Sequence, residues 1–131
     1  MIFDDVLELA RSVSQFTIAG EGNVSVRDGD AMLIKASGST LETMTDDDLV
    51  RCDLDGNAFE GEEKKPSMEV SFHAWILKTF PEINCVCHTH PTNTIKVLCS
   101  GRINDFANRR LFPDQVVRNG TKSCVVPYAT P

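Results

Sequence analysis

The fold is decided by residues 23–35, whose sequence is NVSVRDGDAMLIK. Polar and apolar side chains alternate over residues 23–27, and a second apolar run begins at Ala31, after Asp28-Gly29-Asp30. Alternation with a period of two is typical of a β-strand with one buried face, and an Asp-Gly pair between two such runs is a strong hairpin signal. We therefore predict a β-hairpin over residues 23–35.

Helical and extended segments alternate around this hairpin. Further strands are predicted over residues 50–54, 83–88 and 123–127. Helices are predicted over residues 5–17, 66–80 and 92–98, with a helical turn at residues 45–50. Ser67 is the expected N-cap of the central helix, Thr45 caps the helical turn, and Pro81 ends the central helix. The mixture predicts a layered α/β fold with a largely antiparallel sheet flanked by helices, in one domain over residues 1–131.

Composition excludes several classes of partner. Lys and Arg total 13 and Asp and Glu total 19, so the net charge is −6 and no basic stripe indicates a nucleic-acid partner. The N-terminal residues lack a secretion signal, and no apolar run approaches the roughly 20 residues that a membrane span needs. We expect a cytoplasmic protein without a membrane partner. Its five cysteines, an odd number without a CxxC pair, are expected to be buried free thiols.

The run of residues 85–91, CVCHTHP, places His88 and His90 two positions apart at the end of a predicted strand. Side chains two positions apart on a strand point to the same face, with Cα atoms about 6.6 Å apart, which suits a shared metal ion. Cys85 and Cys87 face the other side, which argues against a four-ligand zinc site. Two histidines are one ligand short of the three that catalytic zinc usually takes.

Other residues could complete a site with this pair. Glu69, in the first turn of the predicted helix, is either a companion of the metal or an acid that stabilises the free amides of the helix start. His73, on the same helix, is more simply a half-buried core residue hydrogen-bonded to the backbone. The small-residue loops 20–23 and 37–39 could bind an anion through backbone N–H groups, although glycine in a turn is usually only a turn.

Taken together, these segments resemble the class II aldolase and adducin family, whose best-known members are aldolases acting on fuculose and rhamnulose phosphates. The resemblance covers nearly the whole chain, in the family's order. It rests on residues 22–27 (GNVSVR), 33–38 (LIKASG), 65–69 (KPSME) with His73, 88–91 (HTHP) and 126–131 (VPYATP).

The resemblance implies a three-layer α/β/α fold with a mainly antiparallel sheet, assembled as a homotetramer. It also implies a metal-dependent aldehyde-lyase that cleaves a small sugar phosphate by reversible aldol chemistry. His88 and His90 match ligands of Zn²⁺ or another divalent metal, and Glu69 matches the catalytic base, which can also touch the metal. The residues that match substrate and phosphate-binding positions are Gly22, Asn23, Ser37, Gly38 and Ser67.

The chain departs from the family pattern at two points. Met68 stands where some aldolases have a second phosphate-binding serine. The family's third zinc histidine lies beyond the VPYATP pattern, so we expect this chain to lack the C-terminal part. The family also includes 4-epimerases, dehydratases, decarboxylases and non-catalytic adducin-like scaffolds, so the reaction stays open. The presence of Glu69, His88 and His90 together favours an enzyme over a scaffold.

Overall fold

The predicted hairpin is present in the computed structural model, which describes residues 2–18, 21–110 and 113–126. Strands β1 (Asn23–Asp28) and β2 (Ala31–Lys35) pair antiparallel, with Asp28 opposite Ala31. Gly29 in the connecting turn has a φ of 62°, which glycine adopts without steric cost. The prediction for residues 23–35 is confirmed.

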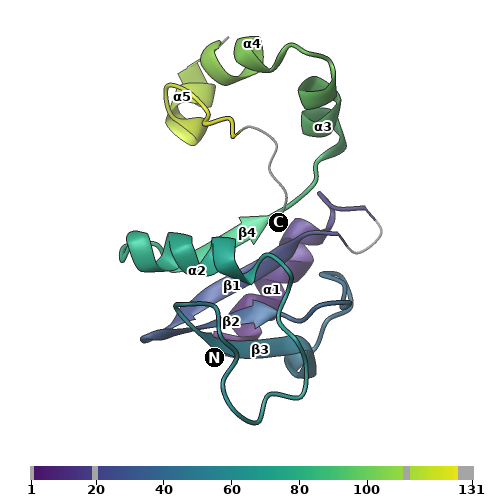
Figure 1. Cartoon of the computed structure of the whole chain (residues 1–131). Coiled ribbons are helices and arrows are strands. Elements are labelled where there is room, and N and C mark those ends of the chain that lie inside the picture. Colours follow the sequence, from purple (N-terminus) through teal and green to yellow (C-terminus); the bar gives the residue numbers. More distant parts are fainter. Residues whose placement is uncertain (1, 19–20, 111–112, 127–131) are drawn as a thin grey trace. The chain divides into compact units, whose positions relative to one another are not determined.

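Two more strands extend the hairpin into a four-stranded sheet. Strand β3 (Leu49–Asp53) pairs with β2, and β4 (Cys85–His88) pairs with β1, giving the order β3-β2-β1-β4 with every pairing antiparallel. Figure 1 shows β4 beside β1, although the chain reaches it only after β3 and the following helix. The start of β1 therefore lies against the end of β4, and Asn23 is opposite His88.

One face of the sheet is covered by α1 (Ile2–Ser14). Leu41 and Met44, from the segment after β2, complete the buried layer between this helix and the strands. The buried cluster on this side consists of Val6, Leu7, Ala10, Val24, Leu41, Met44 and Leu49. The helix ends three residues earlier than predicted, where the hydroxyl of Ser14 donates to the carbonyl oxygen of Arg11 at 2.8 Å, a local bond that competes with helix continuation.

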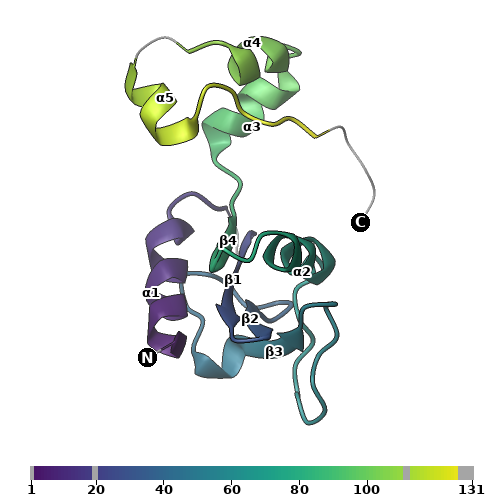
Figure 2. The same cartoon turned by 90° about the vertical axis from the view of Figure 1, so that its left-hand side faces the viewer.

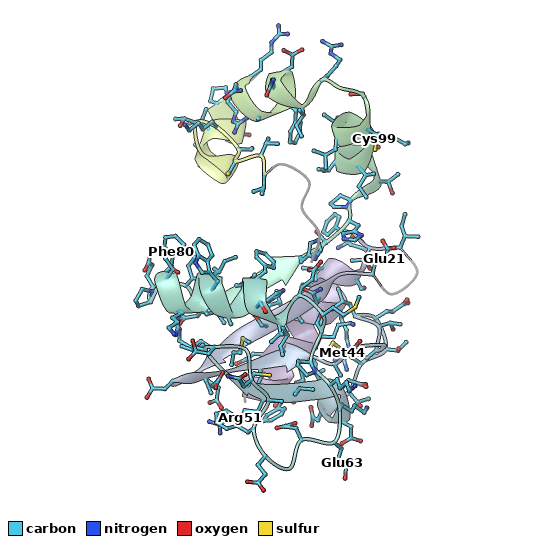
Figure 3. All side chains as sticks on the ribbon, in the orientation of Figure 1. Glu21, Met44, Arg51, Glu63, Phe80 and Cys99 are labelled. Carbon is cyan, nitrogen blue, oxygen red and sulfur yellow. The ribbon has the colours of Figure 1, made fainter. Side chains whose placement is uncertain are left out.

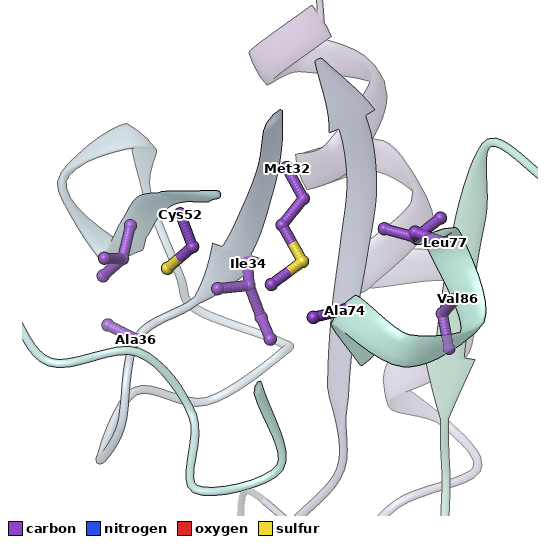
Figure 4. Close-up of a cluster of buried hydrophobic side chains, with 8 residues drawn as sticks. Met32, Ile34, Ala36, Cys52, Ala74, Leu77 and Val86 are labelled. Carbon is purple, nitrogen blue, oxygen red and sulfur yellow. The ribbon is translucent and has the colours of Figure 1, made fainter. Parts of the chain in front are cut away.

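The opposite face is covered by α2 (Val70–Thr79). Figure 2 shows α1 and α2 on the two sides of the sheet. The second buried cluster, drawn in Figure 4, consists of Met32, Ile34, Ala36, Val50, Cys52, Ala74, Leu77 and Val86. Full burial of a side chain as large as Leu or Met contributes roughly 1.5–3 kcal/mol. The predicted α/β class, with helices on both faces of an antiparallel sheet, is confirmed.

Arg27 ties the end of α2 to the sheet. Its guanidinium donates to the carbonyl oxygen of Leu77 and, through Nη2 at 3.1 Å, to that of Ile83. A cation at the C-terminal end of a helix binds carbonyl groups that have no partner within the helix. The helix ends at Thr79, just before Pro81, as predicted.

The start of α2 differs from the prediction. The N-cap is Glu69, not Ser67, and the first helical residue is Val70. The N–H of Ser67 donates to the carbonyl oxygen of Lys35 at 2.9 Å, and the N–H of Ser37 donates to that of Lys65 at 2.9 Å. This short antiparallel bridge keeps Ser67 outside the helix and beside the end of β2. The predicted helical turn capped by Thr45 is present as the 3₁₀ helix η1 (Asp46–Asp48).

Residues 91–131 form a second compact unit, and residues 1–90 form the first. The second contains α3 (Thr92–Cys99), α4 (Ile103–Asn108) and α5 (Pro113–Asn119), of which only α3 was predicted. The strand predicted over residues 123–127 is wrong for residues 123–126, which are not extended in a sheet, and Pro127 lies outside the described residues. The N–H of Ser123 instead donates to the carbonyl oxygen of Ala107 at 2.9 Å.

All five cysteines are free, as predicted. Only Cys52 is buried, so the expectation of buried thiols is wrong for the other four, which are Cys85, Cys87, Cys99 and Cys124. Cys85 and Cys87 lie on β4, the strand at the edge of the sheet, where a side chain has strand neighbours on one side only. Over the three described ranges, no helix has the length and apolar character to cross a membrane.

Candidate active site

A pocket of about 220 Å³ lies where β1 begins and where β2 and β4 end. It contains every residue that the sequence analysis assigned to the site, namely Gly22, Asn23, Ser37, Gly38, Ser67, Glu69, His88 and His90. Three further lining residues were not assigned from the sequence: Glu21, Lys35 and Met68. Figure 3 shows Glu21 at this end of the sheet and Phe80 at the far end of α2.

Gly22 allows the chain to enter β1 directly against β4. Its φ is 90°, and a Cβ atom at this position would lie 2.7 Å from the carbonyl oxygen of His88 and 2.9 Å from Cγ2 of Thr17. Both the positive φ and the close approach to the backbone require glycine. Residues 21 and 23 are thereby held next to the histidine pair.

The two histidines face each other. Their Nε2 atoms are 3.0 Å apart, and their ring centroids are 4.6 Å apart with an interplanar angle of 63°. The prediction that the pair points to one place is consistent with this geometry, although His90 lies two residues beyond the end of β4.

A carboxylate lies at the Nδ1 atom of each ring. Oε2 of Glu21 is 2.6 Å from Nδ1 of His90. Oε2 of Glu69 lies against Nδ1 of His88, a buried atom that has no hydrogen-bond partner among the described residues. Glu69 thus contacts the ring nitrogen of His88 opposite the one that faces His90.

These donors fit a shared divalent metal. A carboxylate only accepts hydrogen bonds, so a proton on Nδ1 of His90 lets that ring donate to Glu21 and leaves its Nε2 lone pair free. A proton on Nδ1 of His88, on the side of Glu69, likewise leaves Nε2 of His88 free. Tetrahedral zinc with Zn–N bonds of about 2.0–2.1 Å separates two ligand nitrogens by roughly 3.3 Å, close to the observed 3.0 Å. Among the described residues, no group of three or more His, Cys, Asp and Glu side chains is placed to hold a metal.

His73 differs from the expectation of a half-buried residue bonded to the backbone. It is fully buried, and both ring nitrogens meet side chains. Nδ1 is 2.7 Å from Oγ of Ser25, and Nε2 contacts Oδ1 of Asn23. The Nδ2 atom of Asn23 in turn donates to Oε2 of Glu69 at 3.2 Å. Burial lowers the pKa of His73 to about 4.

Lys35 was not assigned to the site from the sequence. A lysine at the end of an otherwise apolar strand can nevertheless indicate a functional residue. The residue is only 5% exposed, and Nζ donates to the carbonyl oxygen of Ala36 at 3.2 Å. Burial lowers the pKa of its ammonium group, and the charge of Asp48 opposes that effect. Gly38, also in the pocket, has a φ of 83° and open space around it. The pocket therefore combines a cation, hydroxyl groups and an accessible turn.

The amino-acid sequence matches the family described as Class II Aldolase and Adducin N-terminal domain over residues 5–131. The chain belongs to the class II aldolase and adducin family. It is 33% identical over 130 residues to a 3-oxo-tetronate 4-phosphate decarboxylase of Haemophilus influenzae, covering 96% of this chain and 60% of the relative. It is 37% identical over 76 residues to an L-fuculose phosphate aldolase of Methanocaldococcus jannaschii, covering 58% and 40%.

A solved structure of the same class II aldolase fold is that of YgbL from Escherichia coli, described as a putative aldolase/epimerase/decarboxylase. It matches with a TM-score of 0.83 and 28% identity, covering 99% of this chain and 63% of that one. The chain spans 40% to 63% of the length of these three proteins. The resemblance drawn from the sequence is confirmed. The two named relatives are enzymes of different reactions, so family membership alone does not determine the reaction.

Proposed function

We propose that the protein is a metal-dependent lyase that cleaves a carbon–carbon bond of a small hydroxy-keto sugar phosphate by reversible aldol chemistry. The observation that carries the proposal is the composition of the pocket. It combines a facing imidazole pair and a carboxylate with hydroxyl, amide and ammonium groups that suit a phosphate.

We propose Zn²⁺ or another divalent metal as the cofactor, held by Nε2 of His88 and Nε2 of His90. The third ligand would be the histidine that the family resemblance implies and that this chain does not contain. When bound, the metal would supply Lewis-acid polarisation of the substrate carbonyl.

Glu69 is the proposed catalytic base. Its side chain is 39% exposed and lines the pocket, so it can reach a substrate. It would move a proton at the donor carbon or at the hydroxyl group of the substrate as the carbon–carbon bond breaks and forms. The hydrogen bond from Asn23 would hold one carboxylate oxygen and leave the other for this proton.

The phosphate is proposed to bind at Gly22, Asn23, Ser37, Gly38 and Ser67, to which the structure adds Lys35 as a nearby cation. A phosphate held at one end of the substrate converts binding energy into positioning of the reacting carbon. Among the described residues, the N–H of Gly38 has no acceptor, whereas the N–H of Ser37 donates to the carbonyl oxygen of Lys65. Backbone N–H groups of this kind bind anions in turns.

The proposal is tested by supplying fuculose 1-phosphate and rhamnulose 1-phosphate to the zinc-loaded protein. We expect release of dihydroxyacetone phosphate, measured with a coupled dehydrogenase. Glu69→Gln should lower kcat about 100-fold or more, within the range typical of a lost general base. Glu42→Gln, an exposed glutamate outside the pocket, serves as the control. Unchanged turnover in Glu69→Gln would overturn the assigned role.

Decarboxylation is the second candidate, because the relative that covers 96% of this chain is named as a decarboxylase of a 3-oxo acid phosphate. Release of CO₂ from 3-oxo-tetronate 4-phosphate, without dihydroxyacetone phosphate from the sugar phosphates, would favour it. Isomer interconversion without cleavage would indicate an epimerase, and loss of water a dehydratase. Absence of bound metal and of turnover on all these substrates would favour a scaffold.

We further propose that the protein works in the cytoplasm as a homo-oligomer, tetrameric in the full-length form. The support for the assembly is the family resemblance stated above. Light scattering coupled to size-exclusion chromatography measures the assembly directly, and a monomer at micromolar concentration would contradict it.

A further inference from the structure

We propose that His73 is a positioning residue that fixes the side-chain amide of Asn23 and, through it, the carboxylate of Glu69. His73 does not line the pocket, and its side chain has no exposure to solvent. The inference rests on the proposed role of Glu69 as the base. It adds a residue outside the pocket to the groups that define the site.

The direction of every hydrogen bond in this chain of contacts follows from the carboxylate. An ionised Glu69 only accepts, so the group of Asn23 that faces it must be the NH₂. The other end of the amide, Oδ1, then faces His73 and can only accept. His73 must therefore carry its proton on Nε2.

The far side of the imidazole ring is constrained in the same way. With Nε2 protonated, Nδ1 of a neutral imidazole is an acceptor, so the hydroxyl of Ser25 must donate to it across the 2.7 Å contact. Ser25 is fully buried and has this nitrogen as its side-chain partner. Burial, which lowers the pKa of His73 to about 4, keeps the ring neutral near pH 7 and agrees with this tautomer.

The alternative tautomer would disturb the pocket. A proton on Nδ1 would turn the lone pair of Nε2 toward Asn23, and the amide would have to present its NH₂ to His73. Oδ1 would then face the Glu69 carboxylate, and two acceptors would oppose each other. The observed arrangement also leaves the second hydrogen of Nδ2 available, and Asn23 lines the pocket.

Aromatic packing holds the imidazole in this orientation. Phe72 meets the ring of His73 edge to face, with centroids 5.0 Å apart and an interplanar angle of 77°. The same phenylalanine meets the ring of His88, with centroids 6.3 Å apart. His73 is therefore fixed by packing as well as by its two polar partners.

Nitrogen NMR of the protein labelled with ¹⁵N-histidine tests the tautomer without any substrate. We expect His73 to show a protonated Nε2 and an unprotonated Nδ1 at pH 7. Glu69→Gln replaces the carboxylate that sets the direction of the Asn23 amide and should give a mixture of the two tautomers. A wild-type ring protonated on Nδ1, or a spectrum unchanged by Glu69→Gln, would overturn the proposal.

Kinetics of the metal-loaded protein test the consequence for Glu69. His73→Leu should lower kcat at least tenfold, and His73→Gln, which can still donate to Asn23, should recover part of the loss. Val50→Ala is the matched control, since Val50 is buried in the cluster under α2 and lies outside the pocket. It should lower the urea midpoint without changing kcat. Wild-type kcat in folded His73→Leu would overturn the positioning role.

The two experiments separate failure of this inference from failure of the proposed function. If the wild-type protein lacks lyase turnover, the proposed function fails, and the NMR result still decides how His73 is protonated. If the wild-type protein turns over its substrate and His73→Leu has the same kcat, the inference alone fails.

Discussion

The Nε2 atom of His88 lies 3.0 Å from the Nε2 atom of His90. This spacing predicts that both rings contribute to one metal site. Replacing either histidine with alanine should weaken Co²⁺ or Zn²⁺ binding about 100-fold or more, because one of two nitrogen donors is lost. Isothermal titration calorimetry measures the affinity. The double variant Cys85→Ser/Cys87→Ser, on the same strand, is the control and should bind metal as the wild type does.

Glu21 is expected to support His90 through its 2.6 Å contact with Nδ1. Replacement of an outer-shell carboxylate of this kind typically lowers metal affinity 10- to 100-fold. Glu21→Ala should weaken metal binding by about 10-fold or more, and Glu21→Gln, whose amide oxygen still accepts a hydrogen bond, by less. The exposed Glu82, changed to Gln, is the control. Equal affinity in Glu21→Ala and wild type would show that His90 is oriented by other contacts.

Gly22 and Gly38 form a matched pair for stability measurements. Both have a positive φ, but a Cβ at Gly22 would meet the carbonyl oxygen of His88 at 2.7 Å, whereas a Cβ at Gly38 meets nothing within 4 Å. Gly38→Ala should lower the free energy of unfolding by about 1 kcal/mol, the cost of the backbone conformation. Gly22→Ala should cost more than about 2 kcal/mol, because backbone atoms must move. Urea unfolding measures both, and equal costs would contradict the clash.

The pKa of His73 predicts how stability depends on pH. The pKa is lowered from 6.5 to about 4 in the folded protein, so the unfolded chain binds a proton first. The free energy of unfolding should therefore be unaffected by this group above pH 6.5 and should fall between pH 6.5 and 4. The loss amounts to about 3 kcal/mol. Below pH 4, both states are protonated and the loss levels off.

The variant His73→Gln isolates this contribution, because glutamine does not titrate. Its free energy of unfolding should be lower at pH 7 and should change less than that of the wild type between pH 6.5 and 4. The carboxylates Asp48 and Asp53, whose pKa values are lowered, act mainly below this range. Parallel pH profiles of the variant and the wild type would be inconsistent with a neutral buried imidazole.

Cys52 should be unreactive in the folded protein. Burial raises the pKa of its thiol to about 11, and the thiolate is the form that reacts. At pH 8, titration with Ellman's reagent should count the same number of reactive thiols in native Cys52→Ser as in native wild type. Cys99→Ser, which removes an exposed thiol, should reduce the native count by one. Rapid reaction of Cys52 without denaturant would show that α2 opens readily.

The sequence by itself determined the elements that have a local physical cause. The period-two pattern of residues 23–35 and the Asp-Gly turn specify a hairpin, and the aromatic and aliphatic residues before Pro81 specify a helix. Ordered motifs indicated the family and predicted the residues of the candidate site. All eight assigned residues line one pocket, and each of them stands at or just beyond the end of a strand or helix.

Only the tertiary structure decided how these groups meet. The pairing of Asn23 with His88 and the bridge between Ala36 and Pro66 join segments that are far apart in the chain, and no local pattern specifies such a register. That bridge removed Ser67 from the helix cap. The partners of His73 come from β1, so the sequence of its own helix could not reveal them. Local sequence sets backbone preference, whereas hydrogen-bond partners of buried groups depend on which segments pack together.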